Sequence, residues 1–173
     1  ASADRIDLVM AFIRRSGLAP LLDSLRRHCS AGRPLRVLTT SYTGSTEAKA
    51  LMQLRELGAD LRVSYDTSTT RLHAKTWLFV RESGFSTAYI GSSNLTHSAL
   101  VPGLEWNVRV SGARNGDVID KVRAVFDSYW NSGDFHPFDV DEFRERTAAQ
   151  RRGDGTSWIS PIEVRPYPFQ ERL

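Results

Sequence analysis

Apolar and polar positions along this chain alternate with two different periods. Short apolar or alternating runs predict strands at residues 6–13, 35–40, 61–65, 73–80, 86–90 and 105–110. Apolar residues three or four positions apart predict helices at residues 18–29, 45–57 and 116–130. In the second of these helices, Ser45 or Thr46 is the expected cap and Gly58 the expected stop.

The order of these elements indicates the fold class. The first half reads strand, helix, strand, helix, strand, which favours parallel pairing. The later strands follow one another through short connections, which favours antiparallel pairing. We therefore predict an α/β fold with a mixed sheet and helices on both faces, formed by residues 1–133. The chain becomes more polar from residue 134, and we expect residues 134–173 to form a helix, a linker and the start of a further domain.

Two short segments carry the residues that indicate chemistry. In the first, His73 and Lys75 stand two positions apart, so they share one face if the segment is a strand. In the second, Gly91 is followed by Ser92, Ser93 and Asn94, a turn that can present hydroxyls, an amide and backbone N–H groups. Glu105 follows eleven positions after Asn94. An imidazole, a fixed cation and neutral donors gathered around one point suit attack on a phosphodiester.

Each of these groups has an expected role. Neutral His73 can attack phosphorus and form a phospho-histidine. Lys75, Asn94 and Ser92 can bind the phosphate oxygens as their charge develops. Glu105 can accept a hydrogen bond from an imidazole N–H and so orient the ring. None of these steps requires a metal, and we expect neither a metal nor a cofactor.

Further side chains are candidates for contact with the substrate. We expect Arg71, Ser93 and Thr96, which flank the two segments, and Tyr42 to bind it. The hydroxyl-rich loop 41–45 before a helix can either hold a phosphate or cap the helix, and the sequence leaves both open. Trp77 and Trp106 adjoin motif residues, and we expect them to point to the opposite faces of their strands and pack in the core.

The pattern His73-x-Lys75, Gly91-Ser92-x-Asn94 and Glu105 resembles that of the phospholipase D superfamily. It is most similar to the branch that contains small bacterial nucleases and metal-independent restriction nucleases. The resemblance implies a phospholipase-D-like fold and places the five residues at the functional positions of the family. The chain departs from the pattern at Val80, where the family often has an aspartate.

The resemblance also implies a second subunit. Sites of this superfamily use two His-x-Lys motifs, one histidine as nucleophile and the other as general acid. This chain has a single such motif, because its other three histidines lack a lysine two positions later. The implied form is a homodimer in which His73 of each subunit lies at a shared centre.

The end of the chain carries a second resemblance. Tyr167-Pro168-Phe169-Gln170, followed by Leu173, is similar to the segment upstream of the phosphate-binding loop in superfamily-2 helicases. The similarity implies a parent protein that joins the nuclease-like domain to a DNA-dependent ATPase, as in some modification-dependent restriction enzymes. The chain begins without Met, which also leads us to expect a longer parent. It has no Gly-Lys-Ser/Thr phosphate loop, so we expect no ATP hydrolysis by this segment.

The composition of the chain narrows the classes of protein to which it can belong. A net charge of +3 is compatible with DNA binding, and the single Cys29 excludes an internal disulfide. No apolar run reaches membrane-spanning length and no signal pattern occurs, so we expect a cytoplasmic protein. The sequence therefore predicts a metal-independent DNA endonuclease domain. Two alternatives remain open: a lipid phosphodiesterase of the same superfamily, and a non-catalytic DNA-binding or dimerisation module with a relic site.

Overall fold

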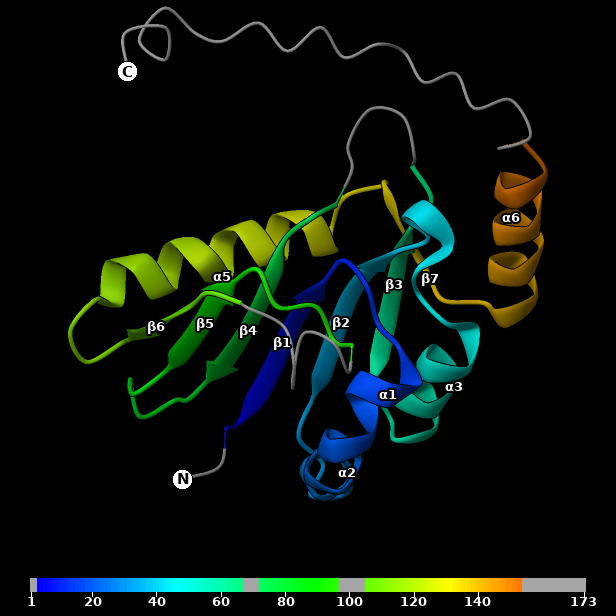
Figure 1. Cartoon of the computed structure of the whole chain (residues 1–173). Helices are drawn as coiled ribbons and strands as arrows, with labels where there is room; N and C mark the ends of the chain where they lie inside the picture. Colours follow the sequence, from blue (N-terminus) through cyan, green and yellow to red (C-terminus); the bar gives the residue numbers. More distant parts are fainter. Residues whose placement is uncertain (1–2, 67–71, 97–104, 154–173) are drawn as a thin grey trace, which may run out of the picture.

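The computed structural model describes residues 3–66, 72–96 and 105–153, with side chains described up to residue 150. These residues form a seven-stranded mixed sheet in the order β6-β5-β4-β1-β2-β3-β7 (Figure 1). Its strands are β1 (Arg5–Met10), β2 (Leu35–Thr40), β3 (Asp60–Ser64), β4 (Lys75–Val80), β5 (Thr87–Gly91), β6 (Asn107–Ser111) and β7 (Phe135–Pro137). β1 to β3 are parallel, and β4 to β7 each run antiparallel to the neighbour on their inner side. The predicted fold class is confirmed.

Helices cover both faces of the sheet. α5 (Gly116–Trp130) lies along one face, and three helices cover the other: α1 (Arg15–Leu18), α2 (Leu22–Ser30) and α3 (Ala48–Glu56). α6 (Val140–Gly153) packs beside α3. Two short 3₁₀ turns, η1 (Ala19–Leu21) and η2 (Tyr42–Gly44), complete the connections.

The central strand β1 is buried on both sides. Ile6, Leu8 and Met10 pack with the apolar residues of α1, α2 and α3, while Val9 packs with α5. Side chains on a strand alternate between its faces, so a strand covered on both sides reads as a nearly continuous apolar run. The exception is Asp7, which is fully buried towards α5.

Asp7 is neutralised by an ion pair that links three elements. Arg36 of β2 donates to Asp7 through Nε at 2.7 Å and through Nη2 at 2.9 Å. The same Nη2 donates to Asp127 of α5 at 2.9 Å. A buried carboxylate without such a partner would cost several kcal/mol, on the order of 3–5. The pair therefore fixes α5 against the two central strands, at a distance from the motif residues.

Two helix boundaries differ from those predicted. The single helix expected at 18–29 is divided into α1, η1 and α2, because Pro20 falls within the stretch and lacks the N–H that a continuous helix needs. α3 begins after Glu47, and neither expected residue caps it. Thr46 instead donates its hydroxyl to the carbonyl of Ala11 at 3.2 Å, which ties the start of α3 to the end of β1.

The predicted division after residue 133 falls inside the folded unit. β7 pairs with β3 in the same sheet, and Phe143 of α6 is buried in the main core. The sequence here is polar because most described side chains of α6 are exposed, while Val140, Phe143, Thr147 and Gln150 are partly or fully buried along one side of the helix. The helicase-like segment at 167–173 lies outside the described residues. Across the described ranges, no helix is both long enough and apolar enough to span a membrane.

Candidate active site

His73 and Lys75 lie together where β4 begins. Lys75 is the first residue of β4 and pairs with Met10 at the end of β1. Its side chain is buried, whereas His73 is exposed just before the strand. Lys75 Nζ donates to the backbone carbonyl of His73 at 2.6 Å and lies 2.8 Å and 3.1 Å from the two ring nitrogens, Nδ1 and Nε2. The buried cation therefore holds both the backbone and the ring of the exposed histidine.

The turn after β5 is bonded to the segment after β1. The Oδ1 of Asn94 accepts a hydrogen bond from the backbone N–H of Phe12 at 3.1 Å, and Leu95 N–H donates to the carbonyl of Phe12 at 3.1 Å. The ring of Phe12 meets His73 edge-on, with 6.1 Å between centroids. These contacts fix the orientation of the Asn94 amide, whose other end is an NH₂ donor.

Ser92 links the turn to Glu105. Its hydroxyl donates to Glu105 Oε2 and accepts from Trp106 N–H at 3.1 Å, while Ser92 N–H donates to the carbonyl of Trp106 at 2.9 Å. Among the described residues, the carboxylate of Glu105 therefore bonds to Ser92 and not to His73, and the binding of a phosphate by Ser92 stays a prediction. The structure makes Ser92 the residue that positions the carboxylate.

Two opposing effects act on the pKa of the Lys75 ammonium group. Burial lowers the pKa of its ammonium group below the usual value, because a charge is less stable away from water. The Glu105 carboxylate acts in the other direction and favours the charged form. Glu105 therefore helps to keep a cation next to His73, a function that the sequence did not indicate.

Glu105→Gln is expected to move the alkaline limb of the pH–rate profile to lower pH. The amide keeps an oxygen that can accept from Ser92 but removes the charge that raises the pKa of Lys75. The ammonium is lost as pH rises through its pKa, so a lower pKa means that activity is lost earlier. The pH dependence of phosphodiester hydrolysis measures this, with Glu56→Gln at the exposed end of α3 as control. An unchanged alkaline limb would contradict the electrostatic role of Glu105.

Gly91 allows β5 and β6 to approach closely beside the site. A Cβ at this position would lie 2.0 Å from the carbonyl oxygen of Trp106 and 2.3 Å from Oδ1 of Asn107. No side chain can occupy that space without moving the backbone of β6. The close packing of the two strands therefore requires glycine at this position of the motif. Because the strands lie so close, Glu105 is within reach of Ser92.

The predicted substrate-binding residues have different surroundings. Ser93 lies at the site, where its hydroxyl accepts from Asn107 Nδ2 at 2.6 Å, and Thr96 N–H donates to the carbonyl of Asn94 at 2.9 Å. Tyr42 belongs to η2, and its backbone N–H donates to the hydroxyl of Thr40 at 3.1 Å. Arg71 lies outside the described residues.

The hydroxyls of the loop 41–45 bond within the protein. Ser41 is buried and accepts from Gln150 Nε2 at 3.0 Å, and the hydroxyls of Thr43 and Ser45 bond to each other at 2.8 Å. Thr43 has a φ of 59°, an uncommon value for a residue other than glycine. These contacts give the loop a role in joining β2 to α6. Of the two roles that the sequence left open, capping is not observed, because Glu47 is the N-cap of α3, and phosphate binding stays untested.

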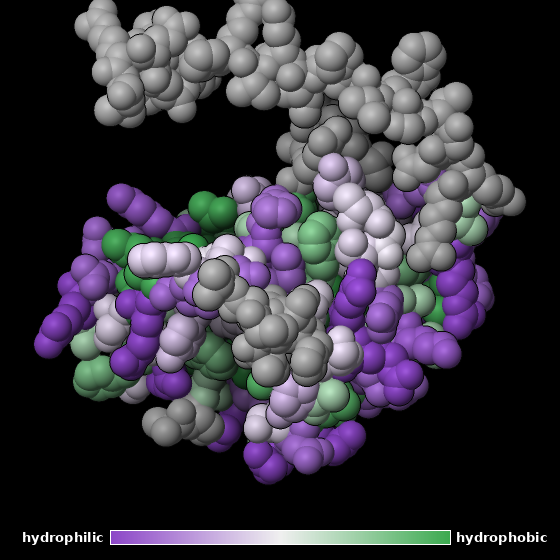
Figure 2. Space-filling model, viewed as in Figure 1, coloured by the Kyte–Doolittle hydropathy of each residue, from purple (hydrophilic) through white to green (hydrophobic). Residues whose placement is uncertain are grey.

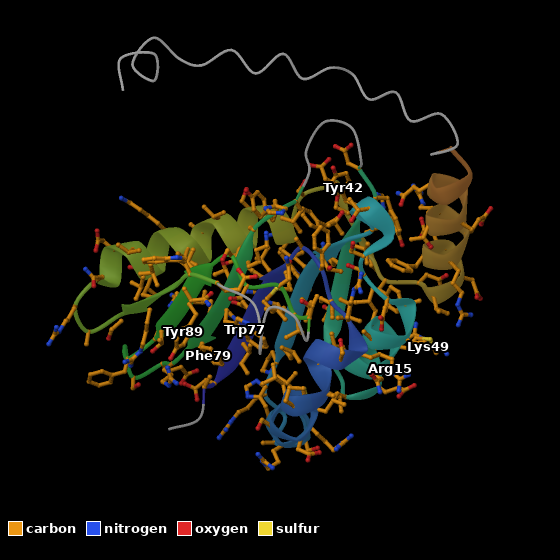
Figure 3. All side chains as sticks on the ribbon, in the orientation of Figure 1. Arg15, Tyr42, Lys49, Trp77, Phe79 and Tyr89 are labelled. Carbon is orange, nitrogen blue, oxygen red and sulfur yellow. The ribbon has the colours of Figure 1, made fainter. Side chains whose placement is uncertain are left out.

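An aromatic cleft opens beside Lys75 on the face of the sheet opposite α5. We use this name for the cleft of about 590 Å³ whose floor is formed by Trp77, Phe79 and Tyr89. Lys75, Asn94 and Glu105 line its polar end. Figure 3 shows the three aromatic residues gathered on β4 and β5. Figure 2 shows hydrophilic side chains over α2 and α3.

The cleft corrects the predicted placement of both tryptophans. Trp77 stands two residues after Lys75 and so shares its face of β4; it is half-buried, packs partly against the main core and lines the cleft. Trp106 is 85% exposed and does not pack in the core. Strand alternation alone predicts the position of Trp77, whereas Trp106 precedes β6 and is not governed by that alternation.

Val80 lies at the far end of β4 from Lys75. The two residues are five positions apart on a strand, roughly 17 Å. Val80 packs with the small apolar cluster under α5, together with Leu78 and Ile119. The absence of an aspartate at this position therefore leaves the groups around His73 unchanged.

Comparison with known proteins gives the family. The family model described as "Cardiolipin synthase, PLD-like domain" matches residues 1–130. The chain belongs to this phospholipase-D-like family. The match contains both motif segments and the strands that position them, and it places the domain in a superfamily of phosphodiesterases. No curated protein matches the chain. Among the described residues, no group of three or more His, Cys, Asp or Glu side chains is arranged to hold a metal ion.

Proposed function

We propose that this phospholipase-D-like domain is a metal-independent endonuclease that cleaves DNA through a phospho-histidine at His73. The contact between the buried Lys75 ammonium and the exposed His73 ring, 2.8 Å from Nδ1, carries the proposal. An exposed imidazole held by a fixed cation can meet an incoming phosphate, and the cation neutralises charge on the non-bridging oxygens. The NH₂ group of Asn94, fixed through its Oδ1, supplies a second donor.

The reaction takes place in two displacements. In the first, a ring nitrogen of neutral His73 attacks phosphorus, a P–N bond forms and the P–O bond to the leaving nucleoside breaks. The leaving oxygen takes a proton from a protonated imidazole. In the second, water attacks phosphorus, the imidazole that gave its proton takes one back from the water, and the P–N bond breaks. The products are an alcohol and a phosphate monoester, and His73 is restored.

The second imidazole comes from another copy of the chain in this proposal. The sequence contains one His-x-Lys motif, and His73 is exposed where a second copy can approach it. A two-fold axis near His73 brings two such motifs to one centre. One histidine then acts as nucleophile while His73 of the partner subunit acts as general acid, so a homodimer has a single site.

DNA is the proposed substrate because several features of the chain agree with it. The net charge of +3 favours a polyanion over a basic partner. The helicase-like segment at the end of the chain suggests a parent protein that moves on DNA. We therefore propose that the domain is the nuclease part of a helicase–nuclease of restriction type.

Incubation with DNA in excess EDTA tests the proposed function. We expect the purified chain to cut plasmid or single-stranded DNA under these conditions, because no proposed step uses a metal. A strict requirement for added Mg²⁺ would contradict the proposal. The same protein is tested on cardiolipin vesicles, where turnover of lipid without cleavage of DNA would identify a lipid phosphodiesterase. Salt-sensitive DNA binding without turnover of either substrate would identify a relic site.

A further inference from the structure

We propose that the aromatic cleft receives an unpaired base of the strand being cut, so that single-stranded DNA is the preferred substrate of this site. This inference rests on the proposed function, because it names the form of DNA that fits next to Lys75. It concerns residues that no proposed chemical step uses: Trp77, Phe79 and Tyr89.

The cleft is complementary to an amphipathic ligand that has one anionic end. Its polar end contains Lys75, the amides of Asn94 and Asn107, and Glu105, whose carboxylate accepts from Ser92. Its remaining wall is mostly apolar and includes Met10 and Leu21 beside the aromatic floor. The transition from polar to apolar occurs along one strand, from Lys75 to Phe79. A nucleotide has the same arrangement, with a phosphate at one end and a flat, largely apolar base at the other.

The aromatic floor is ordered as a stacking surface. The rings of Trp77 and Phe79 are 5.9 Å apart between centroids and only 6° from parallel, and Tyr89 meets Phe79 edge-on at 6.1 Å. Tyr89 is 40% exposed, so its ring is accessible from the cleft. A planar base can extend such a stack whatever its identity, which is how single-stranded nucleic acids bind without sequence preference.

Charge around the cleft also favours a polynucleotide. Arg109 of β6 stands directly opposite Tyr89 in the sheet register and is exposed on the same face. None of the residues that β4, β5 and β6 direct to this face is acidic. A strand with one phosphate at Lys75 can therefore place a neighbouring phosphate near Arg109. The carboxylate that lines the cleft, Glu105, precedes β6 and accepts a hydrogen bond from Ser92.

Two other occupants fit less well. A duplex keeps its bases paired and stacked inside, so it offers no base to the cleft unless one is flipped out. An acyl chain would fill the apolar part but would offer no partner to the NH₂ group of Asn94, whose Oδ1 already bonds to Phe12, or to Oδ1 of Asn107, whose Nδ2 already bonds to Ser93. Covering a polar group without giving it a partner is unfavourable. Base edges carry donors and acceptors for these groups.

Fluorescence anisotropy with a labelled oligothymidylate and a labelled hairpin duplex tests the inference. Binding is measured in a His73→Ala background, which prevents cleavage during the titration. We expect Tyr89→Leu to weaken binding of the single strand about tenfold, the effect of losing one base–aromatic stack, and to leave duplex binding unchanged. Tyr89→Phe keeps the ring and is expected to bind like the parent. Phe85→Leu removes an aromatic ring that is 64% exposed outside the cleft and is the matched control.

The possible outcomes test the role of the cleft separately from the proposed nuclease function. Normal single-strand binding by both Tyr89→Leu and Phe79→Leu overturns it, as does an equal loss of duplex and single-strand binding. Weaker binding of dioctanoylphosphatidylglycerol by these variants, with single-strand binding unchanged, assigns the cleft to acyl chains instead. Cleavage is followed in parallel with His73 intact. If binding depends on the Tyr89 ring but no cleavage occurs, the proposed role of the cleft is supported and the proposed nuclease function is contradicted. If cleavage occurs but binding does not depend on the ring, the nuclease function is supported and the role of the cleft is contradicted.

Discussion

His73→Ala is expected to reduce DNA cleavage by about 10⁴-fold or more, the scale seen when an enzyme loses its nucleophile. The variant should fold normally, because His73 is exposed before β4 and an exposed substitution of this kind changes stability by less than about 0.5 kcal/mol. Single-turnover cleavage assays in EDTA measure the first effect, and thermal unfolding measures the second.

His136→Ala is the matched control for that prediction. His136 is exposed on β7, away from the residues around Lys75, so its loss should leave cleavage unchanged. Mixing the parent with His73→Ala tests the shared site. After subunit exchange at equal concentrations, a site that needs both histidines should retain about one quarter of the parent activity, and independent sites about one half. Cleavage by His73→Ala at the parent rate would refute the proposed nucleophile.

Gly17→Ala is expected to destabilise the protein by about 3 kcal/mol, at the upper end of the range for overpacking. A Cβ at position 17 would lie 2.3 Å from the backbone carbonyl of Leu95 and 2.3 Å from the N of Thr96. Both contacts are with backbone atoms of the turn that carries Asn94, so the turn must shift. Thermal unfolding should show a decrease in Tm of about 10 °C. Cleavage by the folded fraction should also decrease, because a displacement of about 1 Å can cost 10²-fold in rate.

Gly116→Ala provides the comparison for Gly17→Ala. Gly116 is the first residue of α5 and does not adopt a positive φ, and a Cβ added there would meet no heavy atom within 4 Å. We expect its stability and cleavage to match the parent within about 0.5 kcal/mol. Equal stability of the two variants would show that α1 does not pack against the turn as closely as the structure indicates.

The periodic elements could be predicted from the sequence because local rules govern them. β2 and α5 have the predicted bounds, and the switch from parallel to antiparallel pairing follows from the lengths of the connections. The division of the first helix at Pro20 could also have been predicted from the missing N–H. β7 could not, because three residues pair with β3 through contacts distant in sequence.

The chemistry of the site was predictable only in part. The spacing of His73 and Lys75 indicated that they would meet, and the structure shows that they do. The partners of Ser92 and Glu105 depend on how closely β5 and β6 approach at Gly91, which no local pattern encodes. The contact of Asn94 with Phe12 joins segments 82 positions apart and has no sequence signal of its own.

The most direct test of the central claim is to trap the covalent intermediate. The chain is incubated with DNA in excess EDTA, quenched rapidly in alkaline denaturant, in which a phosphorus–nitrogen bond survives, and analysed by peptide mass spectrometry. The account predicts a nucleotide adduct on the peptide that contains His73, absent from His73→Ala and lost on acid treatment. Cleavage without an adduct at His73, or an adduct at another residue, would contradict it.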